Sequence, residues 1–199
     1  MFHQPYYLTV MILIFKVKNC VVKVSYLFVL TLSFSALEKT KTLFLFLVFS
    51  FLHEMCHILC LFVFDNSPQK INISFFGAGI VTYREMSFAK EVVFLLSGVV
   101  FNYLMCFVFQ SNKTVFEVNL ILGFVNSLPV FPLDGGRALK CMIEHFFDFE
   151  VGRNVFKTIS IFTLVLLIVF SLYVFSVSKN MSLIFICLYL LCYLFNNSY

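Results

Sequence analysis

The feature that most constrains this chain is a nearly uninterrupted apolar run from Leu43 to Phe64, with His53, Glu54 and His57 near its middle. A run of this length is typical of a membrane-spanning helix. Ionisable groups at the centre of such a helix are costly unless they have partners or a function. We therefore expect these three side chains to form part of a functional site.

The spacing of the three residues is the His-Glu-x-x-His pattern. In a helix, His53 and His57 project from one face, where two neutral imidazoles can bind one cation. A catalytic zinc site needs a third protein ligand and keeps its fourth position open for water. Glu54 follows the first histidine, so it is placed to take the proton of that water as general base.

The composition indicates an integral membrane protein. The 199 residues are 61% hydrophobic and 12% charged, and the mean hydropathy is +0.99, whereas soluble domains are about 45–50% apolar and about 25% charged. The net charge of +4 is small and scattered. We therefore expect the lipid bilayer, and no nucleic acid, as a partner.

The seven cysteines do not indicate a disulfide framework, because their number is odd and most lie in apolar segments. Cys56 and Cys60 share the histidine helix at i, i+4 spacing. They have two interpretations, as thiolate ligands or as small packing residues. The second is favoured, since a carboxylate further along the chain is the better third ligand.

The segment before the histidine helix contains several short elements. Tyr6 to Phe15 is too short to span a membrane, Cys20 to Val24 is a short strand or an interfacial segment, and Tyr26 to Leu37 is a first spanning candidate. After the histidine helix, Ile71 to Tyr83 predicts a pair of short strands around two glycines. This pair is either a simple interfacial hairpin or an edge that holds an extended peptide.

Four later segments have the length and composition expected of spans: Glu91 to Phe109, Val115 to Leu128, Val155 to Val177 and Met181 to Phe195. Between them, Leu139 to Phe149 predicts an amphipathic interfacial stretch in which His145 is a surface residue. In the span from Glu91, the residues Ser97, Gly98 and Asn102 predict close packing against the histidine helix.

The predicted fold class is an all-α polytopic membrane protein with about six transmembrane helices and a small β-hairpin or sheet between the second and third core spans. We expect residues 1–199 to form a single membrane-embedded domain, with an interfacial segment (1–24), a core (25–137) and C-terminal helices (138–199). Ten lysines and arginines fall on one side of these spans and four on the other. This bias predicts a multi-pass protein of the cell membrane with a cytoplasmic N-terminus.

A break in the helical pattern follows Asn126, where Pro129, Pro132 and a double glycine stop the helix near membrane depth. Irregular backbone at that depth is tolerated where it lines a wet cavity. Asp134, just before the two glycines, is either the third metal ligand or the cap of the next helix. Its combination with the upstream histidines favours the ligand. The Asn126 amide has two equal interpretations, as a contact to a substrate carbonyl or to a backbone group.

These motifs, in this order, resemble the site-2 protease family of intramembrane zinc metalloproteases. The resemblance is carried by His53-Glu54-x-x-His57, Ser97-Gly98 with Asn102, and Asn126-x-x-Pro129 leading to Leu133-Asp134-Gly135-Gly136. It is strongest to the stage IV sporulation protein FB type, which processes pro-sigma-K. Unlike that type, the chain has Gly98-Val99 in place of a glycine-proline pair, and we expect it to lack the C-terminal nucleotide-sensing CBS domain.

The resemblance implies a peptidase in regulated intramembrane proteolysis that cleaves a membrane-associated regulatory protein, in the sporulation type a sigma-factor precursor. It implies Zn²⁺ held by His53, His57 and Asp134, Glu54 as the catalytic base, and Asn126 in contact with substrate. Inhibitory membrane proteins would be further partners. Two other functions stay open: a membrane metal transporter that uses the same three ligands as a transit site, and an inactive scaffold that binds client helices.

Overall fold

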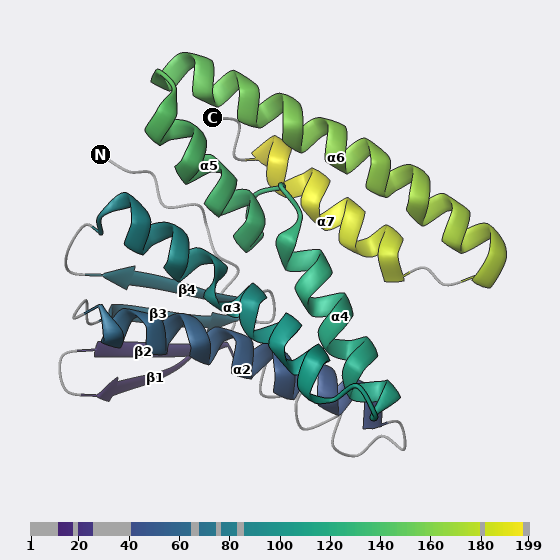
Figure 1. Ribbon diagram of the computed structural model, residues 1–199, viewed down its shortest axis with the longest axis horizontal. Coiled ribbons are helices and arrows are strands. Elements are labelled where there is room, and N and C mark those ends of the chain that lie inside the picture. The colour runs from purple at the N-terminus through teal and green to yellow at the C-terminus, as the bar shows by residue number, and fades with distance from the viewer. Residues whose placement is uncertain are drawn as a thin grey trace.

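The described residues of the computed structural model form one mixed sheet and a set of packed helices (Figure 1). They comprise residues 12–17, 20–25, 41–64, 68–74, 77–82, 86–179 and 182–196. The strands are β1 (Ile12–Val17), β2 (Cys20–Ser25), β3 (Pro68–Ser74) and β4 (Gly77–Thr82). The helices are α2 (Lys41–Val63), α3 (Phe88–Val108), α4 (Lys113–Ser127), α5 (Asp134–Phe146), α6 (Phe149–Ser178) and α7 (Ser182–Asn196).

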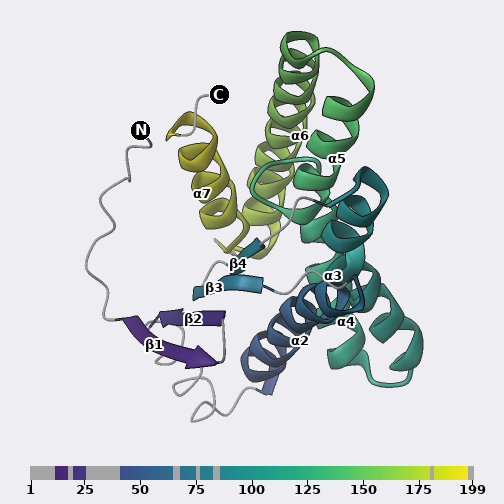
Figure 2. The same cartoon turned by 90° about the vertical axis from the view of Figure 1, so that its left-hand side faces the viewer.

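The sheet has the strand order β1-β2-β3-β4. The outer pairs, β1 with β2 and β3 with β4, are antiparallel, whereas β2 and β3 are parallel. A parallel pair needs a long crossover connection, and α2 lies in the connection between β2 and β3. The edge strand β4 contacts α2, the helix that carries the histidines. Figure 2 shows the sheet on one side of α2.

The helices pack in two groups joined by α5. One buried cluster, with Phe49 and Leu122, joins α2 to α4, and another, with Leu61 and Phe94, includes Ala138 of α5. The pair α6 and α7 packs through a third cluster formed by Val130, Leu164 and Leu190. In Figure 1, α6 runs from the upper left to the right with α7 below it, whereas the sheet lies at lower left. Helix α5 therefore connects the α2–α3–α4 group to the outer pair.

The predicted all-α fold class is wrong, because the described residues include a sheet of four strands. Half of this sheet comes from the N-terminal region, where β2 coincides with Cys20 to Val24, interpreted as a strand or an interfacial segment, and where β1 was not expected. The strand Ile12–Val17 falls mostly within the apolar run Tyr6 to Phe15, and periodicity alone cannot distinguish a buried strand from a piece of helix in so short a run.

The predicted count of about six spans is also wrong for the part of the chain that the structure describes, where three helices are long and apolar enough to cross a membrane: α2, α3 and α6. Helices α4 and α7, predicted as spans, have 15 residues each. At about 1.5 Å per residue such a helix is roughly 22 Å long, shorter than the hydrocarbon core of about 30 Å. The candidate span Tyr26 to Leu37 lies outside the described residues.

The turn between α4 and α5 is compact because two glycines bring the start of α5 against the preceding backbone. A Cβ added at Gly135 would overlap the backbone of Ser127, and one added at Gly136 would overlap the backbone of Val130. Backbone cannot move aside as a side chain can. The double glycine therefore fixes the position of Asp134, the first residue of α5.

We predict that Gly135→Ala destabilises the protein by about 1–3 kcal/mol, the usual cost of overpacking a closely packed interior. The measurement is the free energy of unfolding in mixed micelles, titrated with a denaturing detergent. Gly152→Ala is the control, because its new methyl group would meet the Ile143 side chain at 3.1 Å and this side chain can adjust. Equal stability of the two variants would contradict this account of the turn.

Candidate metal site

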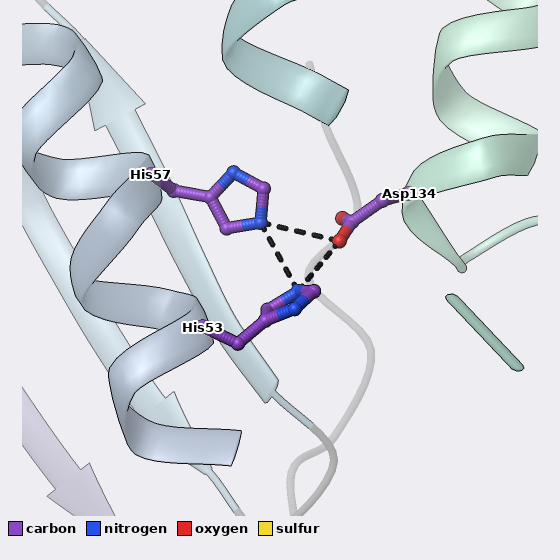
Figure 3. Close-up of side chains that lie close together, drawn as sticks. All are labelled: His53, His57 and Asp134. Atoms are coloured by element: carbon purple, nitrogen blue, oxygen red, sulfur yellow. Dashed lines mark hydrogen bonds and ion pairs between the residues drawn. The ribbon is translucent and has the colours of Figure 1, made fainter. Parts of the chain in front are cut away.

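Three side chains from two helices converge on one buried point (Figure 3). His53 and His57 project from α2, and Asp134 projects from the start of α5. Asp134 Oδ2 lies 2.8 Å from His53 Nε2 and 3.1 Å from His57 Nε2, and the two Nε2 atoms are 3.3 Å apart. The three residues are only 3%, 4% and 8% exposed. Among the described residues, this is the group of potential ligands close enough to hold a metal ion.

Helix α3 provides a hydrogen-bond partner for the Nδ1 atom of each imidazole. His53 Nδ1 lies 2.9 Å from Asn102 Oδ1, and His57 Nδ1 lies 2.7 Å from the carbonyl oxygen of Phe94. A carbonyl oxygen only accepts, so Nδ1 carries the hydrogen in both rings under these contacts. Ser97 Oγ is a further neighbour, 3.0 Å from His57 Nδ1. A neutral ring in this tautomer presents its Nε2 lone pair toward Asp134, which is the arrangement of histidines that bind metals.

Asp134 does not cap its own helix. The N-cap position of α5 is occupied by Leu133. The Asp134 carboxylate faces the two imidazoles, and its Oδ1 atom lies 4.0 Å from a guanidinium nitrogen of Arg137. Burial by itself would raise the pKa of Asp134, but the interactions with His53 and His57 lower this pKa well below its usual range. These interactions need a proton on the facing Nε2 atoms, so a proton takes the position between the carboxylate and the imidazoles that a metal ion would otherwise occupy.

The three atoms fit a small divalent cation. Two imidazole lone pairs and a carboxylate oxygen all accept hydrogen bonds, so they cannot satisfy one another without a proton or a metal between them. Donor atoms in a tetrahedral zinc site, at about 2.0–2.2 Å from the ion, are roughly 3.3 Å apart. The observed separations of 2.8, 3.1 and 3.3 Å are close to that value. A metal ion therefore needs little rearrangement, and it competes with protons for these atoms.

Gly98 leaves the space into which the two imidazoles turn. A Cβ at this position of α3 would lie 2.5 Å from His53 Nε2 and 2.6 Å from His57 Nε2. Even the smallest side chain would therefore displace the nitrogen atoms that face Asp134. Gly98 and Asn102 are one helical turn apart, so α3 meets the site with both residues on one face.

The two other predicted site residues, Glu54 and Asn126, are not members of the ligand group. Glu54 is half-buried on α2, next to His53 in the sequence. Asn126 is half-buried near the end of α4, where its Nδ2 donates to the Leu122 carbonyl oxygen at 3.1 Å. The Leu122 carbonyl lies within α4 and is not an unpaired backbone group, so both interpretations of Asn126, a contact to substrate and a contact to an unpaired backbone group, stay predictions.

The residues that sequence reasoning assigned only to packing are the ones on α3. Ser97, Gly98 and Asn102 were expected to let helices approach, and all three lie beside the histidines. Asn102 carried a signal that could have identified it, since a fully buried amide in an apolar helix needs a partner. The thiolate interpretation of Cys56 and Cys60 finds no support, because the ligand group in the described part of the chain contains no cysteine.

His145 is not a member of this ligand group either. Its ring stacks on Phe88 with 3.9 Å between ring centroids.

Comparison with known proteins points to one family. Residues 108–170, less than half of the chain, match the family model described as Peptidase family M50; this segment includes Asp134 but neither histidine. The structure matches the Site-2 Protease from Methanocaldococcus jannaschii with a TM-score of 0.60 and 18% sequence identity, over 90% of this chain and 91% of that chain. The chain therefore has the fold of that protease. No curated protein matches its sequence.

We predict that Gly98→Ala weakens metal binding at least about tenfold, the lower end of the usual loss when the support of metal ligands is disturbed. Isothermal titration of the metal-stripped protein with Zn²⁺ in detergent measures this loss. The matched control is Gly152→Ala, another helical glycine, where the added Cβ would lie 3.1 Å from the Ile143 side chain and away from the ligands. Unchanged affinity in Gly98→Ala would rule out this approach of α3 to the site.

Proposed function

We propose that the chain is an intramembrane zinc metalloendopeptidase of the site-2 protease family. The observation that carries this proposal is the convergence of His53, His57 and Asp134 within 3.3 Å of one another, on a fold shared with a site-2 protease. The M50 match around Asp134 and the three long apolar helices support the same assignment.

The residues have separate roles in this proposal. His53, His57 and Asp134 hold the metal, while Asn102 and the Phe94 carbonyl keep the imidazoles turned toward it. Zn²⁺, when bound, supplies a water of lowered pKa and polarises the peptide carbonyl. Glu54 takes the proton from the attacking water and passes it to the nitrogen of the departing amine. The number of protons on Glu54 is therefore the same before and after cleavage.

The substrate enters as an extended segment. A transmembrane helix resists hydrolysis because its backbone groups are bonded to one another, so a peptide must be unwound before its carbonyl can react. Strand β4 lies at the edge of the sheet and contacts α2. Pairing with this edge would hold a peptide extended beside the helix that carries the histidines. Asn126 would contact the peptide from α4.

The substrate class in this proposal is a membrane-associated regulatory protein. The sporulation subtype and its sigma-factor precursor rest on the sequence resemblance alone and stay predictions, as do inhibitory membrane partners and the cytoplasmic N-terminus. The transporter and scaffold alternatives have no structural observation that favours them over hydrolysis.

We predict that Glu54→Gln lowers peptidase activity at least about a hundredfold, since general acid–base catalysis contributes typically about 10²–10⁴-fold. It should leave bound zinc unchanged, because Glu54 is not a ligand. The assay is cleavage of fluorescein-labelled casein, an unfolded protein that offers extended segments, by the purified protein in detergent. Glu117→Gln is the control, since Glu117 is exposed on α4 and paired with Lys113.

Full cleavage by Glu54→Gln would refute the role of Glu54 as base. If the wild type binds zinc, fails to cleave casein and transports Zn²⁺ into vesicles, the transporter is favoured instead. The scaffold gains support if the wild type binds zinc and shows neither activity.

A further inference from the structure

The charged residues of α6 are confined to its first turns and place this end of the helix at the membrane surface. Residues 158–178 contain no charged side chain, whereas Glu150, Arg153 and Lys157 precede them. The uncharged part is about 31 Å long at about 1.5 Å per residue, which matches the hydrocarbon core of about 30 Å. Arg153 and Lys157 therefore lie at the level of the lipid headgroups.

Helices α5 and α6 enclose a cavity of about 140 Å³ at this level. Its lining includes Lys140 and Glu144 from α5, and Phe149, Arg153, Phe156 and Lys157 from α6. The surface of this cavity is almost entirely apolar, so Lys140, Arg153 and Lys157 line it with their carbon chains. Their charged groups lie at its rim together with Glu144, which is 3.7 Å from Lys140. The rim keeps an excess of positive charge after that ion pair is counted.

The acidic residues nearby do not cancel this charge within the cavity. Asp148 lines a separate hollow with His145 and Phe147, and Glu150 is not part of the cavity lining. The guanidinium of Arg153 lies over the Phe149 ring, 5.6 Å from its centroid, and Lys140 Nζ lies 5.7 Å from the centroid of Phe131. Such contacts hold cationic groups beside apolar surface.

The corner between α5 and α6 is apolar on its outer surface. Phe146, Phe147 and Phe149 are 72%, 53% and 68% exposed. Exposed rings next to basic side chains are typical of a segment that lies at the boundary between headgroups and acyl chains. The corner therefore presents apolar and cationic groups together at one membrane level.

We propose that this cavity and its cationic rim bind an anionic phospholipid. The phosphodiester would interact with Lys140, Arg153 and Lys157, and the first acyl carbons would lie against Phe149 and Phe156. A zwitterionic lipid carries its own cation beside the phosphate, so it gains less from three cationic side chains. A bound lipid would bridge α5, whose first residue is Asp134, to α6. This inference requires the fold and a bilayer, and it is independent of peptidase activity.

The test compares lipid retention by the purified protein in native mass spectrometry after incubation with phosphatidylglycerol or phosphatidylcholine. The wild type should keep about one phosphatidylglycerol and lose phosphatidylcholine. The triple variant Lys140→Gln, Arg153→Gln, Lys157→Gln should bind phosphatidylglycerol at least about tenfold more weakly, since each basic residue near the surface contributes measurably to anionic lipid binding. The matched control removes the same charge elsewhere, with Lys41→Gln, Lys113→Gln and Lys179→Gln.

Several results would overturn the proposal. They are equal retention of the two lipids by the wild type, equal phosphatidylglycerol binding by the triple variant and its control, and displacement of the lipid by millimolar inorganic phosphate, which would indicate a site for a free anion. The comparison of lipids on the wild type does not depend on how the variants fold. As a single change, Arg153→Lys keeps all three charges and should retain most of the wild-type binding, whereas Arg153→Gln alone should weaken it.

Discussion

The structure depends on bringing three lone pairs to one buried point. His53, His57 and Asp134 would repel one another there unless a cation lay between them, and water cannot reach them freely because all three are buried. The two histidines come from one helix and the aspartate from another, 77 residues further along the chain. The site therefore exists only when α2 and α5 are held together, and the packing around them serves that purpose.

Two other parts of the chain hold the ligand side chains of α2 and α5 in position. Helix α3 contributes Gly98, whose missing side chain admits the imidazoles, and Asn102, which lies against the far nitrogen of His53. The double glycine after Asp134 brings the start of α5 against the turn that follows α4. In this way the small residues of the sequence, which taken singly only indicate close packing, set the positions of the ligand atoms.

The sequence allowed the histidine pair and the aspartate to be selected, since ionisable groups in an apolar helix need a reason to be there, and the structure brings the three side chains together. Their role as metal ligands stays a prediction. The first strand of the sheet, Ile12–Val17, was not predicted, because a segment this short has too little periodicity to distinguish a strand from a helix. The span count failed because Val115 to Leu128 is apolar enough to resemble a span, while its helix is only 15 residues long. The supporting role of Asn102 needs the path of α3 in space, which sequence spacing does not supply.

The most direct test of the central claim is the zinc content of the detergent-purified protein, measured by inductively coupled plasma mass spectrometry. We expect about one zinc per wild-type chain, and less than about a tenth of that in Asp134→Ala and in the double variant His53→Ala, His57→Ala, because a site left with one or two protein ligands binds zinc weakly. Asp148→Ala, which changes an exposed aspartate outside the site, should keep the full content. A folded wild type that holds no zinc after zinc is supplied, or Asp134→Ala with undiminished zinc, would contradict the three-ligand site.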